Sequence, residues 1–146
     1  MRLVDVNVLV YAFREDAPGH PAFKQWLDAS VQSREAYAVS DHILSGFLRV
    51  VTHPRVFHPP TPIAAALAFA GAYRSQPNAV IVAPDVRHWD LFTSLCATSG
   101  ARGNLIPDAW FAALAIESGS EWVTTDRDFA RFPGLRWRHP LELPTA

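Results

Sequence analysis

Short apolar runs alternate along the chain with segments in which apolar residues recur every three or four positions. Runs of three or four mostly apolar residues predict buried strands, and the longer periodic segments predict amphipathic helices. The predicted strands cover residues 3–6, 37–39, 79–82 and 122–124, with a further short one at 135–137. The predicted helices cover residues 8–13, 18–33, 63–73, 88–98 and 108–117, together with a helix that is capped by Ser40 or Asp41 and stops at His53–Pro54.

Strands that alternate with helices in this way imply a parallel sheet with helices on both faces. The sequence therefore predicts an α/β fold with a central, mostly parallel sheet of four to five short strands. In the last predicted helix, Pro107 opens the first turn and Gly119 follows the end, as is usual at helix termini. A length of 146 residues suits one domain, and the chain shows no internal repeat or linker, so we expect residues 1–146 to form a single domain.

Composition narrows the class of protein. Hydrophobic residues make up 49% and charged residues 18%, which is typical of a globular chain. The one cysteine, Cys96, allows neither a disulfide framework nor a cysteine-based zinc site within the chain. Asp5 stands where a signal peptide would need apolar residues, and no run of 18 apolar residues follows. We expect a cytoplasmic protein.

The charge of the chain is almost balanced. A formal net charge of −1 gives no bulk attraction for nucleic acid. Arginine accounts for all the basic residues except Lys24, and its planar guanidinium suits phosphate groups. Two interpretations stay open, a local arginine cluster that holds RNA and a GC-rich genome in which arginine replaces lysine everywhere.

Three aspartates lie where a strand or loop meets a helix. Asp5 ends the first strand, Asp108 follows Pro107, and Asp126 comes directly after the strand at 122–124. Sites in parallel α/β folds form at the carboxyl ends of the strands, where several carboxylates would repel one another. Mg²⁺ relieves this repulsion, and it needs only a few carboxylates because it keeps several waters.

Each of these acids also has a purely structural explanation. Asp5 could be a helix N-cap, and Asp108 could be a first-turn acid that the helix dipole stabilises. Asp126 and Asp128 could be ordinary turn residues. The order and context of the acids together, rather than any one of them, indicate a site.

Four segments resemble the PIN-domain nucleases, and within them the VapC-like toxins of bacterial toxin–antitoxin pairs. The resemblance runs from Leu3 to about Leu135, and the segments keep the order of the family. They are residues 4–12 (VDVNVLVYA), 47–57 (FLRVVTHPRVF), 104–109 (NLIPDA) and 125–129 (TDRDF).

The resemblance implies a metal-dependent endoribonuclease. The catalytic carboxylates of this enzyme would be those of Asp5, Asp108 and Asp126. They would bind Mg²⁺, or Mn²⁺ as a substitute. Asn7 and Thr125 would be polar supports of the site, and Asp128 a weaker metal ligand. The resemblance also implies a homodimer, an RNA substrate and inhibition by a cognate VapB-like antitoxin.

Four arginines lie near these motifs, where they would contact the RNA backbone or simply be solvated. They are Arg49, Arg55, Arg102 and Arg127. Four early aromatic residues exceed what one thin core stripe needs, so they form either a groove for a partner helix or part of the core. They are Tyr11, Phe13, Phe23 and Trp26.

One position departs from the family pattern. The family commonly has a glutamate just before the Phe-Leu-Arg-Val stretch, and this chain has Gly46 there. Asp41 lies five residues earlier, about 500° round the helix, so it does not simply replace the missing side chain. This departure keeps an alternative open, a catalytically weak or inactive PIN-like module that binds a partner protein or RNA.

Other aspartate-based α/β proteins fit less well. A haloacid-dehalogenase-like phosphatase and a phospho-receiver domain both need a late lysine, and the chain has no lysine after Lys24. The six histidines show no spacing typical of a metal site, and we expect them in loops and on helix surfaces.

Overall fold

Five short parallel strands form the central sheet of the computed structural model, which describes residues 1–142. The strand order is β3-β2-β1-β4-β5, and every neighbouring pair is parallel. This confirms the predicted α/β fold and its mostly parallel sheet. The strands are β1 (Arg2–Val4), β2 (Tyr37–Val39), β3 (Ala79–Ile81), β4 (Glu121–Val123) and β5 (Trp137–Arg138).

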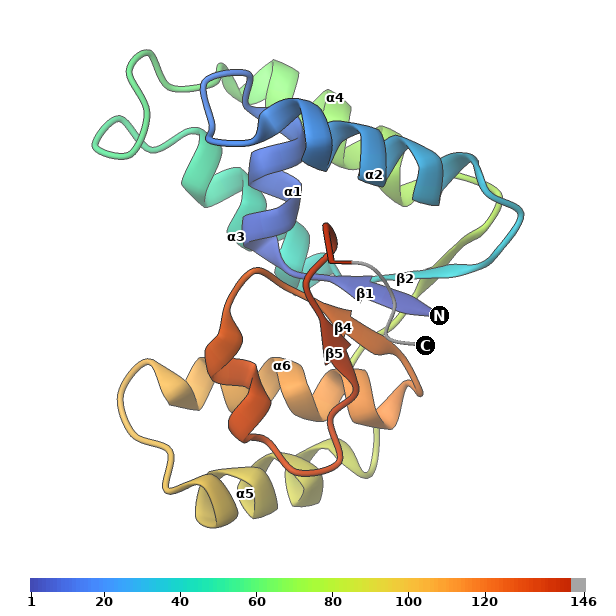
Figure 1. Cartoon of the computed structure of the whole chain (residues 1–146), viewed down its shortest axis with the longest axis vertical. Coiled ribbons are helices and arrows are strands. Elements are labelled where there is room, and N and C mark those ends of the chain that lie inside the picture. The colour runs from blue at the N-terminus through green and yellow to red at the C-terminus, as the bar shows by residue number, and fades with distance from the viewer. Residues whose placement is uncertain (143–146) are drawn as a thin grey trace.

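Helices cover both faces of the sheet (Figure 1). Parallel strands need such crossover helices, because the chain must return to the same end of the sheet before each new strand begins. One face carries α1 (Val6–Phe13), α2 (His20–Gln32), α3 (Asp41–Val51) and α4 (Ile63–Arg74). The other face carries α5 (His88–Ser99) and α6 (Leu105–Glu117), and a 3₁₀ helix, η1 (Arg127–Arg131), follows β4.

The core lies on both sides of β1 and β4, the two strands that lead into the predicted site. Leu3, Trp122 and Val123 are at most 1% exposed, as expected for strands with both faces covered. Helix α6 packs on them through small residues that are fully buried, which brings its backbone close to the sheet. These residues are Ala109, Ala112, Ala113 and Ala115.

The start of α6 differs from the prediction. The helix begins at Leu105 rather than Asp108, so Pro107 lies inside the first turn instead of opening it. Proline is tolerated there because the first backbone N–H groups of a helix have no partner within it. Leu105 and Ile106 donate instead to the carbonyls of Arg102 and Gly103. Asp108 remains a first-turn acid.

Other expectations were wrong as well. The strand predicted at residues 3–6 ends at Val4, because Val6 already begins α1. The last strand begins at Trp137, two residues later than predicted, because Leu135 still donates to Phe132 in the preceding turn. His88, expected on a surface, is only 2% exposed. Its ring packs 4.1 Å from that of Trp110 and its Nε2 lies 3.0 Å from the Trp110 carbonyl oxygen, so a contact between α5 and α6 buries it.

The early aromatic residues belong mainly to the core. Phe23 is 7% exposed and its ring lies 5.0 Å from that of Tyr11. Phe13 packs 4.8 Å from Phe69 of α4. The core interpretation therefore holds for Phe13 and Phe23, whereas Trp26 is half-buried and borders a cavity away from the acids. None of the helices within residues 1–142 combines the length and apolar character that crossing a membrane requires.

Candidate active site

Three aspartates from separate parts of the chain line one pocket of about 390 Å³ at the carboxyl ends of β1 and β4. Asp5 directly follows β1 and caps α1, since its Oδ1 accepts from the Val6 N–H at 2.7 Å. Asp126 follows β4 and caps η1, with Oδ1 2.9 Å from the Asp128 N–H. Asp108 enters from the first turn of α6. The structural and functional explanations of these acids thus apply together, because the caps also aim carboxylates into the pocket.

A buried hydroxyl connects two of these acids. Thr124 is fully buried, donates to Asp5 Oδ2 at 2.7 Å and accepts from the Asp126 N–H at 3.0 Å. Asn7 donates to Asp5 Oδ2 at 3.2 Å and accepts from the Thr125 N–H at 3.4 Å. Of the two neighbouring threonines, Thr125 therefore contributes its backbone and Thr124 its side chain. The sequence analysis missed Thr124, although a threonine that ends a buried strand beside two acids was a usable signal.

The pocket holds more negative charge than its surroundings neutralise. Burial raises the pKa of Asp5 to about 6, with smaller contributions from the charges of Asp108 and Asp126, although the hydrogen bonds from Thr124 and the Val6 amide lower it. Burial, together with the charges of Asp126 and Asp128, also raises the pKa of Asp108 to about 6. Ionising all these acids together is therefore unfavourable in the metal-free protein.

The donor atoms of the pocket fit a hard divalent cation. Asp5, Asp108 and Asp126 offer carboxylate oxygens, which Mg²⁺ and Mn²⁺ prefer, and a cation would relieve their repulsion. Within residues 1–142, no three His, Cys, Asp or Glu side chains lie close enough together to form a complete metal cage. Mg²⁺ does not require one, because it commonly binds one or two carboxylates directly and keeps its remaining waters.

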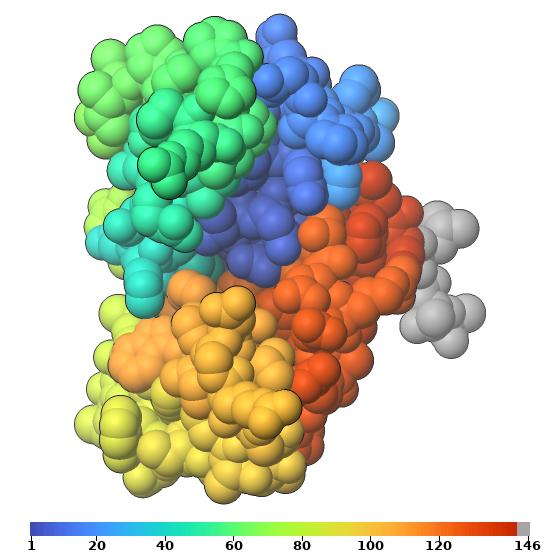
Figure 2. Space-filling view, turned by 90° about the vertical axis from the view of Figure 1, so that its left-hand side faces the viewer, coloured from blue at the N-terminus to red at the C-terminus, as the bar shows by residue number. Residues whose placement is uncertain are grey.

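Apolar residues line the same pocket. We call five of them the apolar wall: Val10, Tyr11, Val50, Val56 and Phe57. Its residues come from α1, the end of α3 and the loop that follows α3. Figure 2 shows this face of the molecule, where the blue N-terminal segment lies between the green segment above it and the orange segment below it. Segments far apart in the sequence therefore border one surface.

Comparison with known proteins identifies the family. The family model described as PIN domain matches residues 2–135. The chain belongs to the PIN domain family. This PIN domain is 44% identical over 142 residues to ribonuclease VapC43 of Mycobacterium tuberculosis strain H37Rv, and the match covers 97% of each chain. The resemblance found in the four sequence motifs is thus confirmed.

Solved structures share the fold. VapBC-1 from nontypeable Haemophilus influenzae matches this PIN domain with a TM-score of 0.69 at 14% identity, over 97% of this chain and 98% of that one. VapC20 of Mycobacterium tuberculosis, described as a sarcin–ricin loop cleaving toxin, matches with a TM-score of 0.63 at 17% identity, over 93% and 99%. At these identities the two structures support the fold alone.

The position of Gly46 in this PIN domain leaves little room for a side chain. A Cβ atom at Gly46 would lie 3.0 Å from Cγ2 of Val6, the residue next to Asp5. Helix α3 therefore passes close to the start of α1, and any side chain at Gly46 would push against it. Asp41 does not compensate, because it pairs with Arg74 at 2.7 Å and does not line the acid pocket.

The predicted RNA-binding arginines lie outside the acid pocket. Arg127 is exposed and forms an ion pair with Glu142. The other three are exposed as well; they are Arg49, Arg55 and Arg102. Asp128 is also exposed, and its carboxylate lies 3.6 Å from Arg131. The charge of Arg131, which the sequence analysis missed, lowers the pKa of Asp108 and partly offsets the repulsion within the pocket.

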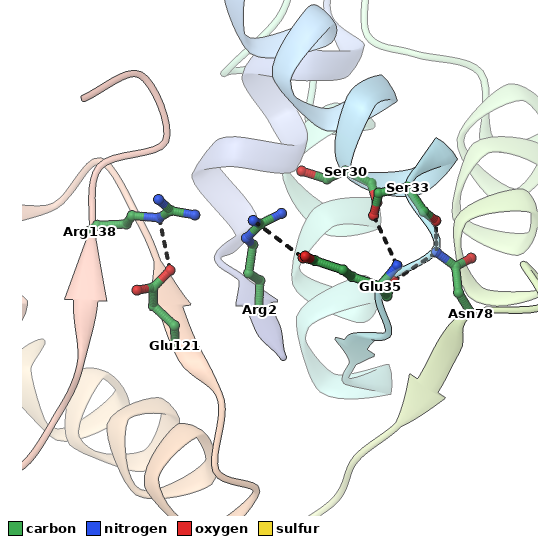
Figure 3. Close-up of polar contacts among 7 residues, drawn as sticks. All are labelled: Arg2, Ser30, Ser33, Glu35, Asn78, Glu121 and Arg138. Carbon is green, nitrogen blue, oxygen red and sulfur yellow. Dashed lines mark hydrogen bonds and ion pairs between the residues drawn. The ribbon is translucent and has the colours of Figure 1, made fainter. Parts of the chain in front are cut away.

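A separate cavity of about 500 Å³ lies at the amino ends of β1, β2 and β4, remote from the carboxyl-end acids. Two ion pairs border it, Arg2 with Glu35 at 3.6 Å and Arg138 with Glu121 at 2.8 Å (Figure 3). The charges of these four residues cancel and Arg136 also lines the cavity, so it lacks the excess negative charge that would attract a metal cation. The acid pocket is therefore the better candidate for chemistry.

Proposed function

We propose that this PIN domain is a metal-dependent endoribonuclease that acts as the toxin of a toxin–antitoxin pair. The convergence of Asp5, Asp108 and Asp126 on one pocket carries the proposal. The raised pKa values of Asp5 and Asp108 support it, because burial and neighbouring carboxylates both disfavour ionisation there, as is common at functional sites. Similarity to ribonuclease VapC43 along nearly the whole chain supports RNA as the substrate.

Each residue of the pocket has a part in this function. Asp5, Asp108 and Asp126 would supply carboxylate oxygens to Mg²⁺, or to Mn²⁺ in its place, with one or two of them binding directly and the rest through the waters of the ion, and Asp128 would be a weaker ligand. When bound, the ion supplies a coordinated water of lowered pKa and neutralises charge on the phosphate. Thr124, with Asn7 and the Thr125 amide as further polar supports, fixes the orientation of Asp5 through the contacts described above.

The protein itself contributes positioning, since phosphodiester hydrolysis by an activated water needs no nucleophilic side chain. The exposed arginines hold the RNA backbone at some distance from the scissile phosphate, because they lie outside the pocket that the acids line. They are Arg49, Arg55, Arg102 and Arg127.

The proposed partner is a VapB-like antitoxin. The similar Haemophilus influenzae structure is a VapBC protein, which supports a partner of this kind. We propose that the toxin forms a homodimer and acts in the cytoplasm. Expression of the chain alone should then arrest growth, and co-expression of the adjacent antitoxin frame should relieve the arrest. Equal growth with and without that frame would count against a toxin.

A second candidate function is a catalytically weak or inactive PIN module that binds RNA or a partner protein. Two observations favour it: Gly46 in place of the usual glutamate, and the lack of a complete metal cage within residues 1–142. Incubation of purified protein with structured RNA and Mg²⁺ or Mn²⁺ separates the two functions. Cleavage that a chelator abolishes, and that the Asp108→Asn variant lacks, supports the enzyme. Intact RNA under all these conditions supports the binding module.

A further inference from the structure

The apolar wall and the acids line a single pocket, so a molecule whose phosphate reaches the acids can also contact this wall. Val56 is 53% exposed, and Phe57 beside it is half-buried. Apolar side chains that remain accessible next to a charged site are costly in water, and they commonly mark a surface that contacts a ligand. With a divalent cation on the acids, the pocket would suit an occupant that has an apolar face and a phosphate close by.

Backbone hydrogen bonds fix the loop that carries Val56 and Phe57. The Thr61 N–H donates to the Val51 carbonyl at 2.8 Å, and the Phe57 N–H donates to the His53 carbonyl at 3.1 Å. These bonds close the loop at its base and at its tip. The loop thus presents Phe57 in a defined position, as a binding surface requires.

The Phe57 ring is held from one side by Arg14. The Arg14 guanidinium carbon lies 4.2 Å from the ring centroid, which is cation–π geometry. Arg14 is itself fixed by a two-pronged contact with Asp16 and by a 3.1 Å hydrogen bond to the Thr61 hydroxyl. One face of the ring is therefore occupied by a fixed cation, while the ring also lines the acid pocket.

We infer that the apolar wall is a nucleobase subsite, in which an unstacked base next to the scissile phosphate stacks on Phe57. This inference rests on the proposed ribonuclease function and extends it to how the RNA is held. Unpaired bases bind proteins by stacking on aromatic rings, and every base offers a flat face for it. A nucleotide combines such a face with a phosphate, which matches the pairing of apolar wall and acids in one pocket.

The subsite predicts that Phe57 acts mainly on binding. The test uses a short single-stranded RNA, in its intact form and in versions with one abasic nucleotide at each position in turn. In the intact RNA, Phe57→Leu should raise KM and the dissociation constant about tenfold and leave kcat nearly unchanged, because leucine keeps apolar bulk but cannot stack. One abasic position should remove this difference between wild type and variant.

Two further variants serve as controls. Phe57→Trp should restore binding of the intact RNA, since tryptophan also stacks. Leu67→Ala removes an apolar side chain, 52% exposed, from α4 outside the pocket, and it should change neither KM nor the dissociation constant. Circular dichroism verifies that each variant is folded.

Fluorescence anisotropy measures RNA binding without requiring cleavage. It therefore tests whether a base stacks on Phe57 separately from whether the protein cleaves RNA. Failure of the wild type to cleave any RNA with Mg²⁺ or Mn²⁺, while the abasic pattern appears in binding, contradicts only the ribonuclease. Equal losses for Phe57→Leu on intact and on every abasic RNA overturn the subsite. Normal RNA binding by Phe57→Leu together with escape from inhibition by the antitoxin also overturns it, and assigns the wall to a protein partner.

Discussion

Replacing Asp108 by asparagine should stabilise the metal-free protein at neutral pH. The pKa of Asp108 is about 6 in the folded protein and 3.8 as the ordinary value, so the folded state binds this proton more tightly than the unfolded chain does. Between about pH 4 and pH 6 the free energy of unfolding therefore falls as pH rises, and it stays reduced above that range. Asparagine carries no charge, so the variant does not lose this part of the free energy of unfolding.

The size of the effect follows from the shift. At about 1.4 kcal/mol per pKa unit, a shift from 3.8 to about 6 sets an upper limit of about 3 kcal/mol. Asp108 is half-buried, so solvent screening reduces the expected gain to about 1 kcal/mol. For a chain of this length that gain corresponds to a rise in Tm of about 2–4 °C. Residues 1–142 form no hydrogen bond to the Asp108 side chain, so the amide loses no bonding partner.

Thermal unfolding followed by circular dichroism, in a chelator and from pH 4.5 to 8, measures this gain. The variant should unfold at higher temperature than the wild type at pH 7.5, and the difference should shrink towards pH 4.5. Asp90→Asn is the matched control, because Asp90 is also a first-turn aspartate but is exposed on α5. A Tm of Asp108→Asn at or below that of the wild type at pH 7.5 would refute the account of charge repulsion in the pocket.

Further predictions concern catalysis and metal binding. Asp5→Asn and Asp108→Asn should each keep the fold and lose most metal-dependent RNA cleavage; near-wild-type rates in both would refute their role as ligands. Thr124→Val should reduce kcat/KM about 10- to 100-fold. It should also move the acidic limb of the pH profile of kcat/KM to higher pH, because Asp5 loses a hydrogen-bond donor that lowers the pKa of Asp5. An unchanged pH profile would contradict this role of Thr124. Gly46→Glu combined with Val6→Ala should bind Mg²⁺ more tightly by calorimetry than Gly46→Ala with Val6→Ala, and equal affinities would show that Gly46 does not face the metal.

Local patterns made most of the fold predictable. The predicted strand at residues 37–39 matches β2, and Ser40 caps α3 as one of the two residues proposed for it. The place of Asp5 in the pocket was predictable because it follows a buried strand, and the carboxyl ends of parallel strands are where sites form. The start of α6 was less predictable, since a proline in the first turn does not reveal how many helical residues precede it.

Long-range contacts decided what the sequence could not show. The choice between Thr124 and Thr125 depends on where β4 ends and which side chain then turns inward, and the dipeptide itself is symmetric. The burial of His88 depends on Trp110, which lies 22 residues away. The apolar wall requires the loop after α3 to fold against α1, and no local pattern around Phe57 indicates that contact.

Anomalous diffraction from crystals soaked in Mn²⁺ tests the central claim most directly, because it locates the ion without reference to activity. The account predicts a Mn²⁺ peak in the acid pocket, within coordination distance of a carboxylate oxygen of Asp5, Asp108 or Asp126 and lost in Asp108→Asn crystals. A fully soaked crystal with no peak in this pocket, or with its strongest peak bound by other residues, would contradict the claim that these aspartates form the metal site of the enzyme.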